Sequence, residues 1–356
     1  MNQSMSKKIP LSRAKKAWSI MMLLGTLLAV TVLFSISYGT MKVPWEDTLT
    51  IIGHRLPVIG NSFPPVNEEF QAVVWNIRMP RVLVGALVGT ALGVSGAVMQ
   101  GVFGNPLADP GIIGVSSGAS FGAVVAIFLG LTSVSMLMMP AFALAGAIAA
   151  VSATVFLSMS RGKIPVMTFL LSGVAVNMLM GAMTSGILTL MNEYRVREYL
   201  FWVVGGLDYR RWEHVYLAVG PIFIGLVLLC LLARQLNVLV LGEQEAKAVG
   251  VPVAAMRLLL VFVAAGTTAM AVCVSGTIGF VGLIVPHIMR IVVGPEHRWL
   301  LPSSALAGAL FLVLCDTIGR ILFPPNEIRV GIMTAFLGAP YFLYLLRKIQ
   351  QSGGVS

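Results

Sequence analysis

Hydrophobic residues come in long runs along this chain, rather than in the alternation typical of a strand or the one-sided pattern of a surface helix. A helix needs about 20 apolar residues to cross a bilayer. We identify ten such runs, the eighth short and interrupted by glycine and proline, at residues 18–38, 82–103, 108–130, 136–158, 165–191, 215–233, 257–276, 279–293, 300–322 and 330–346. They predict an all-α polytopic membrane protein with about ten transmembrane helices.

The first run follows a basic segment and is long enough to span the membrane, whereas a signal peptide has a shorter core and a small-residue cleavage site. Basic residues favour the cytosolic side, so we expect a cytosolic N-terminus. An even number of spans then places both termini in the cytosol. The expected parts are a cytosolic tail at 1–17, one transmembrane domain at 18–346 and a cytosolic tail at 347–356.

Three connections between the runs are long: two predicted outer segments, about 40–79 and 192–214, and a predicted cytosolic loop, about 234–257. The second outer segment is rich in aromatic residues, which either anchor it at the membrane interface or contact a ligand. In the cytosolic loop, a short amphipathic stretch from Glu243 to Ala248 is bounded by glycines. We interpret it as a surface helix that a soluble partner could hold, because a mere connecting turn would not need such length.

Composition agrees with a membrane protein. Hydrophobic residues make up 57% of the 356 positions and charged residues only 11%, against about 25% in ordinary soluble domains. The formal net charge is +10. Because the charges lie at the ends of apolar runs, we relate them to topology and docking rather than to nucleic acid.

The predicted outer side is rich in arginine, with one lysine, Lys42, against nine arginines. Arginine binds carboxylates in a bidentate way, so the excess indicates an acidic partner or ligand. The alternative is a mixed surface, since eight carboxylates share that side. The arginines are Arg55, Arg78, Arg81, Arg195, Arg197, Arg210, Arg211, Arg320 and Arg329.

Two patterns inside the runs concern packing. The second run carries small residues in steps of four, which lets another helix backbone approach closely; they are Gly85, Gly89, Gly93, Ala97 and Gly101. In the ninth run Asp316 and Arg320 are spaced for a contact within one helix. A lone intramembrane carboxylate is also the main support for an alternative, an ion-coupled secondary transporter.

Motifs of soluble enzymes have little support here. Gly114–Gly118 matches the G-x-S-x-G nucleophile pattern, and with His287 it suggests an intramembrane serine hydrolase as a distant alternative, although that pattern requires a strand, a turn and a helix. No phosphate-binding glycine loop is present, so any ATP would be bound by another chain. The three cysteines and four histidines lack the spacing of a metal site. We therefore predict no catalytic residues, no metal and no cofactor bound by this chain.

Several stretches, in order and covering almost everything after about residue 70, match one known family. They are RMPR from Arg78, SGAVMQGVFGNPLADPGIIGVSSGASFGA from Ser95, LSGVAVN from Leu171, FWVVGGLD from Phe201, LGEQEAKAVGV from Leu241, GTIGFVGLIVPHIMR from Gly276, the run from His297 to Arg320, and EIRVGIMTAFLGAPYFLYLL from Glu327. With these stretches the chain resembles the FecCD-type permeases, a family that includes the vitamin B12, haem and ferric-siderophore permeases of type II ABC importers.

The resemblance implies a vitamin B12 permease-like fold in the bacterial cytoplasmic membrane, paired with an identical or paralogous second permease. It further implies two ABC ATPase subunits, which use ATP and Mg, and an external substrate-binding protein. The residues it assigns are Arg78, Arg81 and Arg320 to docking of that protein, Leu241, Gly242, Glu243, Ala246 and Gly250 to ATPase coupling, and Asn105, Leu107 and Thr168 to a cytosolic gate.

The cargo implied by the family is a ferric siderophore or related iron chelate, with haem and cobalamin left open. A wide path that binds its cargo weakly would carry few polar groups. The fifth run offers such candidates in Asn177, Thr184, Ser185 and Thr189. The alternative is that these side chains bond nearby backbone carbonyls, as hydroxyl groups in membrane helices often do.

Overall fold

The computed structural model describes residues 11–39, 41–55, 64, 66–159 and 166–353. The first ten residues of the predicted N-terminal tail, part of the first outer segment and the last three residues lie outside the described residues. Within the described chain all regular elements are helical, and the only bridge outside them pairs Phe323 with Asn326.

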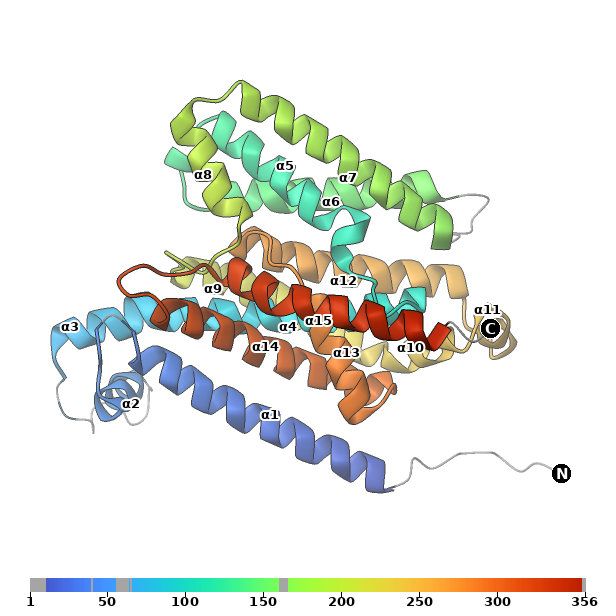
Figure 1. Cartoon of the computed structure of the whole chain (residues 1–356), viewed down its shortest axis with the longest axis horizontal. Coiled ribbons are helices and arrows are strands. Elements are labelled where there is room, and N and C mark those ends of the chain that lie inside the picture. The colour runs from blue at the N-terminus through green and yellow to red at the C-terminus, as the bar shows by residue number, and fades with distance from the viewer. Residues whose placement is uncertain (1–10, 40, 56–63, 65, 160–165, 354–356) are drawn as a thin grey trace.

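The helices follow one another along the whole described chain (Figure 1). The α-helices are α1 Leu11–Ser37, α2 Trp45–His54, α3 Glu68–Gln71, α4 Met79–Phe103, α5 Val115–Phe128, α6 Met138–Ser158, α7 Val166–Thr189, α8 Glu193–Val203, α9 Trp212–Leu231, α10 Ala233–Val240, α11 Glu243–Ala248, α12 Val253–Ser275, α13 Val281–Val293, α14 His297–Ile321 and α15 Val330–Gly353. A π-helical segment, η2, covers Ala72–Arg78, and two short 3₁₀ turns, η3 and η4, cover Pro110–Ile113 and Leu131–Ser133.

Ten of these elements correspond to the ten predicted spans. Seven described helices are long and apolar enough to cross a membrane, and three shorter apolar helices, α5, α13 and the Val330–Leu345 part of α15, match the remaining runs. The fold prediction of about ten transmembrane helices is thereby confirmed. α5 is shorter than its predicted run of 108–130 because the chain first makes the 3₁₀ turn η3, Pro110–Ile113, which is followed by Gly114 with a positive φ of 99°.

The second span begins much earlier than predicted. α3, η2 and α4 form one continuous helical segment, Glu68–Phe103, of 36 residues, whereas the apolar run starts at residue 82. The sequence boundary was set by Arg78 and Arg81, whose charges end the apolar run. In the structure both side chains are buried and bonded, so the helix continues through them.

α4 lies at the centre of the molecule, in contact with α9, α12, α13 and α14 (Figure 1). In its most apolar stretch 78% of the residues are buried, against 17% for α1 and 22% for α7. α1 runs along one edge of the molecule, whereas α5, α6, α7 and α8 form the opposite edge. The exposed side chains of α1 and α7 are mostly apolar, which suits contact with lipid or with another membrane helix.

Glycines bring the central helices into backbone contact. A Cβ added at Gly89 would lie 2.2 Å from the carbonyl oxygen of Gly308 in α14, and one at Gly96 would lie 2.0 Å from that of Gly282 in α13. No side chain fits in such a space. Gly89 belongs to the small-residue stripe, so the dense packing predicted from it is confirmed, with α14 as the helix packed against the stripe. Gly96 lies outside the stripe and brings α4 against α13.

Candidate functional site

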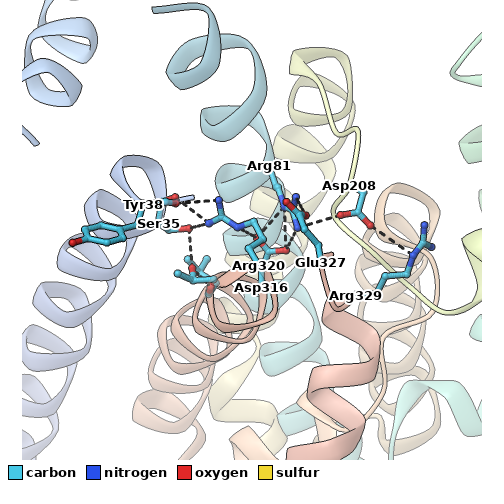
Figure 2. A network of polar contacts seen from close by, with 10 residues as sticks. Ser35, Tyr38, Arg81, Asp208, Asp316, Arg320, Glu327 and Arg329 are labelled. Atoms are coloured by element: carbon cyan, nitrogen blue, oxygen red, sulfur yellow. Dashed lines mark hydrogen bonds and ion pairs between the residues drawn. The ribbon is translucent and has the colours of Figure 1, made fainter. Parts of the chain in front are cut away.

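A network of charged side chains joins α4, α14, the connection between α14 and α15 and the connection before α9, at the predicted outer end (Figure 2). At its centre Arg81 binds Asp316 in a bidentate way, with Nε 3.0 and 3.1 Å from the carboxylate oxygens and Nη2 2.8 Å from Oδ1. Arg81 also contacts Glu327 at 2.7 Å and Asp208 at 3.2 Å. One guanidinium thus holds carboxylates from three different parts of the chain.

Two further arginines tie α1 to this network. Arg320 contacts Asp316 at 3.3 Å and donates to the carbonyl oxygen of Ser35 at 3.0 Å. Arg78 donates to the carbonyl oxygens of Ile36 and Ser37, both at 2.7 Å, and of Met41. Carbonyls at a helix C-terminus lack partners within the helix, and cationic side chains satisfy them. The end of α1 is therefore fixed by arginines of α14 and η2.

The three arginines expected to dock a binding protein are all buried: Arg78, Arg81 and Arg320 are 5%, 8% and 7% exposed. Their contacts are internal, so docking through them would require these bonds to open. The predicted contact between Asp316 and Arg320 is present. Asp316 is shared by two arginines, so it is an ion-pair partner and not the free carboxylate that the secondary-transporter alternative requires.

The predicted gate residues lie on two segments that the structure joins. α4 ends at Gly104, which has a φ of 59°, and the Gly104 and Asn105 N–H groups bond back to Gly101 and Gln100, the pattern of a Schellman C-cap. The side chain of Asn105 accepts from the N–H of Leu107 at 2.9 Å. Phe103 stacks on Phe169 of α7 at 5.5 Å.

This stacking places the turn that carries Asn105 and Leu107 against the start of α7. Thr168, next to Phe169, is exposed, as is Asn105, whereas Leu107 is half-buried. The structure therefore brings the two predicted gate segments together at one end of the molecule. Their role as a gate stays a prediction.

Of the polar candidates on α7, Asn177 links α7 to η3 and α5 by hydrogen bonds. Its Nδ2 donates to the carbonyl oxygens of Gly111 and Ile112, at 3.3 and 2.9 Å, and its Oδ1 accepts from Ser117. It therefore holds η3 and α5 against α7.

The three hydroxyl residues of α7 differ from one another. Thr189 bonds the carbonyl of Gly186 at 2.7 Å, as the alternative reading expects. The buried Thr184 hydroxyl has no hydrogen-bond partner among the described residues, and Ser185 is exposed. Their part in a translocation path stays a prediction.

The predicted coupling segment contains a short helix, α11, preceded by Gly242 with a φ of 130° and followed by Gly250 with a φ of 82°. Lys247 and Glu243 form an ion pair on its exposed face at 2.6 Å. Ala246 is fully buried and packs within the chain, and its part in coupling stays a prediction.

The coupling loop also exposes two large apolar side chains. Leu241 and Val249 are 70% and 67% exposed on either side of α11. Large apolar side chains so exposed outside the spans are typical of a contact surface. Val249 was not among the predicted coupling residues. It directly precedes Gly250, and this position in the sequence could have identified it as part of the coupling segment.

The hydrolase alternative fails on its structural context. Gly114–Gly118 runs from the end of η3 into α5, so the strand that a nucleophile elbow requires is replaced by helix. Among the described residues no group of three His, Cys, Asp or Glu side chains converges, and the absence of a metal site stays a prediction. Sequence reasoning placed Arg329 among the outer arginines but did not predict its contact with Asp208 or the contact of Glu327 with Arg81, because these three residues join the network from loops and gave no periodic signal.

The FecCD transport family model matches residues 27–348. The chain is 44% identical to a cobalamin import system permease of Halobacterium salinarum, with 86% of each chain covered, and 41% identical to a hemin transport system permease of Yersinia pestis, with 81% and 87% covered. It is also 40% identical to an uncharacterized ABC transporter permease of Bacillus subtilis, with 92% and 93% covered.

One solved structure is similar along almost the whole chain. It is an inward-facing metal-chelate type ABC transporter, with a TM-score of 0.80, 33% identity, and 93% of this chain and 99% of that chain covered.

Proposed function

Because the chain belongs to the FecCD transport family and is the permease subunit of a type II ABC importer, we propose that its cargo is a bulky metal chelate. The observation that carries this proposal is the similarity over most of the chain to two permeases and a transporter whose names concern such chelates. A ferric siderophore, predicted from the sequence, is one candidate. Cobalamin and haemin, in the names of the two relatives, favour a macrocyclic chelate as the second.

The proposed complex contains two permeases in the cytoplasmic membrane, two cytosolic ATPase subunits that hydrolyse ATP with Mg, and an external binding protein. The exposed apolar faces of α7 and α15, with Met178 71% and Phe336 75% exposed, support pairing with a second permease along these helices. Both termini of this chain lie in the cytosol in this arrangement.

Transport in this proposal alternates between outward and inward access. The ATPases would close on ATP and move the coupling segment around α11. That segment follows α10, which packs on α4 and α14, the two helices held together by the charged network and by glycine contacts. Movement of α11 would thereby be transmitted through α10 and α4 to the gate turn at Asn105, which follows the end of α4. ATP hydrolysis would take place on the partner subunits.

The test is uptake by a deletion strain given radiolabelled ferric siderophores, haemin and cobalamin in parallel. Loss of one cargo, restored by the wild-type gene, identifies the substrate. Restoration should depend on the copurifying ATPase, so a catalytically dead ATPase is the control. Uptake of all these chelates at the wild-type rate, in a strain shown to hold no second permease, would overturn the proposed cargo class.

A further inference from the structure

A cavity of 300 Å³ lies between the start of α1 and the connection from α13 to α14. Its volume is at the lower end of the range for ligand pockets, about 300–1,000 Å³. α1 begins at the end of the molecule that also carries α11, so the cavity lies on the side that we predict to face the cytosol (Figure 1). The side chains of Lys16, Glu296 and Trp299 line it, together with the last residues of α13, Ile291–Val293.

The cavity lies at the depth of lipid headgroups. Lys16 lies near the start of the candidate span in α1, and Glu296 directly precedes the candidate span in α14. Trp18, 58% exposed, contacts the ring of Trp299 edge to face, with 5.9 Å between the ring centroids. Tryptophan is enriched where a membrane helix passes from the hydrocarbon into the headgroup region. A ligand in this cavity would therefore come most directly from the bilayer.

Two opposite charges line the cavity, and both are free to bind a ligand. The ion pairs in the part of the chain that the structure describes include neither Lys16 nor Glu296. Glu296 is the N-cap residue of α14, yet its side chain makes no capping hydrogen bond. The N–H of His297 donates instead to Oδ1 of Asn237, at 2.9 Å. The carboxylate and the exposed ammonium group of Lys16 thus suit a ligand that carries both charges.

The end of α13 adds to the negative side of the cavity. The last carbonyls of a helix have no partner within it, and the helix dipole favours a cation at this end. In α13 the carbonyl of Arg290 accepts from the N–H of Gly294, and the carbonyls that follow it belong to Ile291–Val293, which line the cavity. These carbonyls and Glu296 together suit an ammonium group, whereas Lys16 suits a phosphate.

We propose that this cavity binds the headgroup of a phosphatidylethanolamine molecule, with its phosphate on Lys16 and its ammonium group on Glu296 and the last carbonyls of α13. Phosphatidylglycerol has no cation to offer Glu296, and the choline group of phosphatidylcholine has no N–H to donate to it. Ile291, 68% exposed, and Trp18 provide apolar surface for the glycerol and acyl chains. This apolar surface favours a lipid over a soluble phosphate compound.

The bound lipid links α1 to the helices beside it. α1 lies at the edge of the molecule, and only 17% of its most apolar stretch is buried. Its far end is fixed by Arg78 and Arg320. A phospholipid that contacts Lys16 and Glu296 fixes its near end against α13 and α14. This inference depends on the placement of the chain in a membrane and is independent of the proposed cargo.

The experiment is native mass spectrometry of the full-length protein, with any subunits that copurify, titrated with single phospholipids in detergent. We expect phosphatidylethanolamine to bind about fivefold more tightly than phosphatidylglycerol or phosphatidylcholine, as one additional ion pair at a helix end allows. Glu296→Gln should abolish this preference, and Lys16→Gln should weaken binding of both phosphatidylethanolamine and phosphatidylglycerol.

The matched controls are Lys15→Gln, the exposed neighbour outside the cavity, and Glu46→Gln, exposed on α2. Both should bind all three lipids as the wild type does. Equal affinity of the wild type for the three lipids would overturn the inference, as would a preference that survives Glu296→Gln. Soluble phosphoethanolamine at the same concentration should not displace the lipid, and effective displacement would overturn the assignment to a lipid.

A second measurement does not depend on how well the variants fold. A phosphatidylethanolamine with a diazirine next to its glycerol group is incorporated into nanodiscs with the wild-type protein and activated by light. Peptide mapping should find the label at residues 16–20 and 291–299, and much less of it at Met167, which is 69% exposed at the start of α7. Equal labelling of α7 and the cavity would mean that lipid surrounds the protein without a specific site, and would overturn the inference.

Discussion

Arg81 of α4 and Asp316 of α14 lie 235 positions apart in the sequence and bind each other through two guanidinium nitrogens and both carboxylate oxygens. The same two helices are in backbone contact further along, at Gly89 and Gly308. Two unrelated kinds of interaction thus fix one helix pair, a bidentate ion pair at one end and glycine packing in the middle. α4 and α14 are expected to move as a unit.

Asp316→Asn should strongly destabilise the protein. The substitution leaves Arg81 and Arg320 buried with a reduced countercharge, and breaking a buried ion pair from one side costs about 3–5 kcal/mol. The measurement is the thermal unfolding midpoint of the purified permease in detergent. Glu327→Gln is the matched control, because the Glu327 side chain is 35% exposed and Arg81 keeps Asp316. Equal midpoints for the Asp316 variant and wild type would contradict the structural role of this ion pair.

Gly89→Ala should also destabilise the protein, because its Cβ would lie 2.2 Å from a backbone oxygen and α4 and α14 would have to separate. Overpacking of this kind typically costs about 1–3 kcal/mol. Gly25→Ala is the control, since nothing lies within 4 Å of that position in α1. Alanine in an open helix is more favourable than glycine by roughly 0.5–1 kcal/mol. Opposite shifts of the two unfolding midpoints are therefore expected, and shifts of the same sign would argue against the close contact.

Much of this fold could be predicted because a bilayer imposes one strong rule, the length of an apolar run. The rule identified all ten spans, including the short ones. It placed the start of the second span too late, because charged residues such as Arg78 and Arg81 usually mark the end of a transmembrane helix at the membrane surface. Their partners, Asp316 and the carbonyls of α1, come from distant parts of the chain, and no local pattern reveals them.

The candidate site was less predictable for the same reason. The contact between Asp316 and Arg320 followed from their spacing on one helix and was confirmed. The accessibility of a side chain depends on the tertiary structure, so Arg78, Arg81 and Arg320, the arginines expected to dock a partner, proved to be buried. Asn177 was recognised as polar, whereas its bonds to η3 depend on how α5 and α7 pack.

Leu241→Asp should weaken the complex with the ATPase. Leu241 is 70% exposed at the start of the coupling segment, and a charge there opposes burial in an apolar contact. The measurement is the amount of ATPase that copurifies with the tagged permease. Ala255→Asp, exposed in the first turn of α12 and so favourably placed near a helix N-terminus, is the control. We expect less ATPase to copurify with the Leu241→Asp variant and an unchanged amount to copurify with the Ala255→Asp variant. Full copurification with Leu241→Asp would mean that Leu241 does not lie in the proposed contact.

Asn177→Ala should lower both stability and transport, because Asn177 braces η3 and α5 against α7. The carbonyls of Gly111 and Ile112 would lose their shared donor, and an unsatisfied buried polar group costs about 1–3 kcal/mol. Thr189→Val is the control, since the Thr189 hydroxyl bonds only a carbonyl of its own helix, and both properties should stay near wild type. The measurements are the unfolding midpoint and the uptake rate per folded transporter. An unchanged midpoint with a changed uptake rate would instead mean that Asn177 contacts the cargo and that its bonds to η3 contribute little to stability.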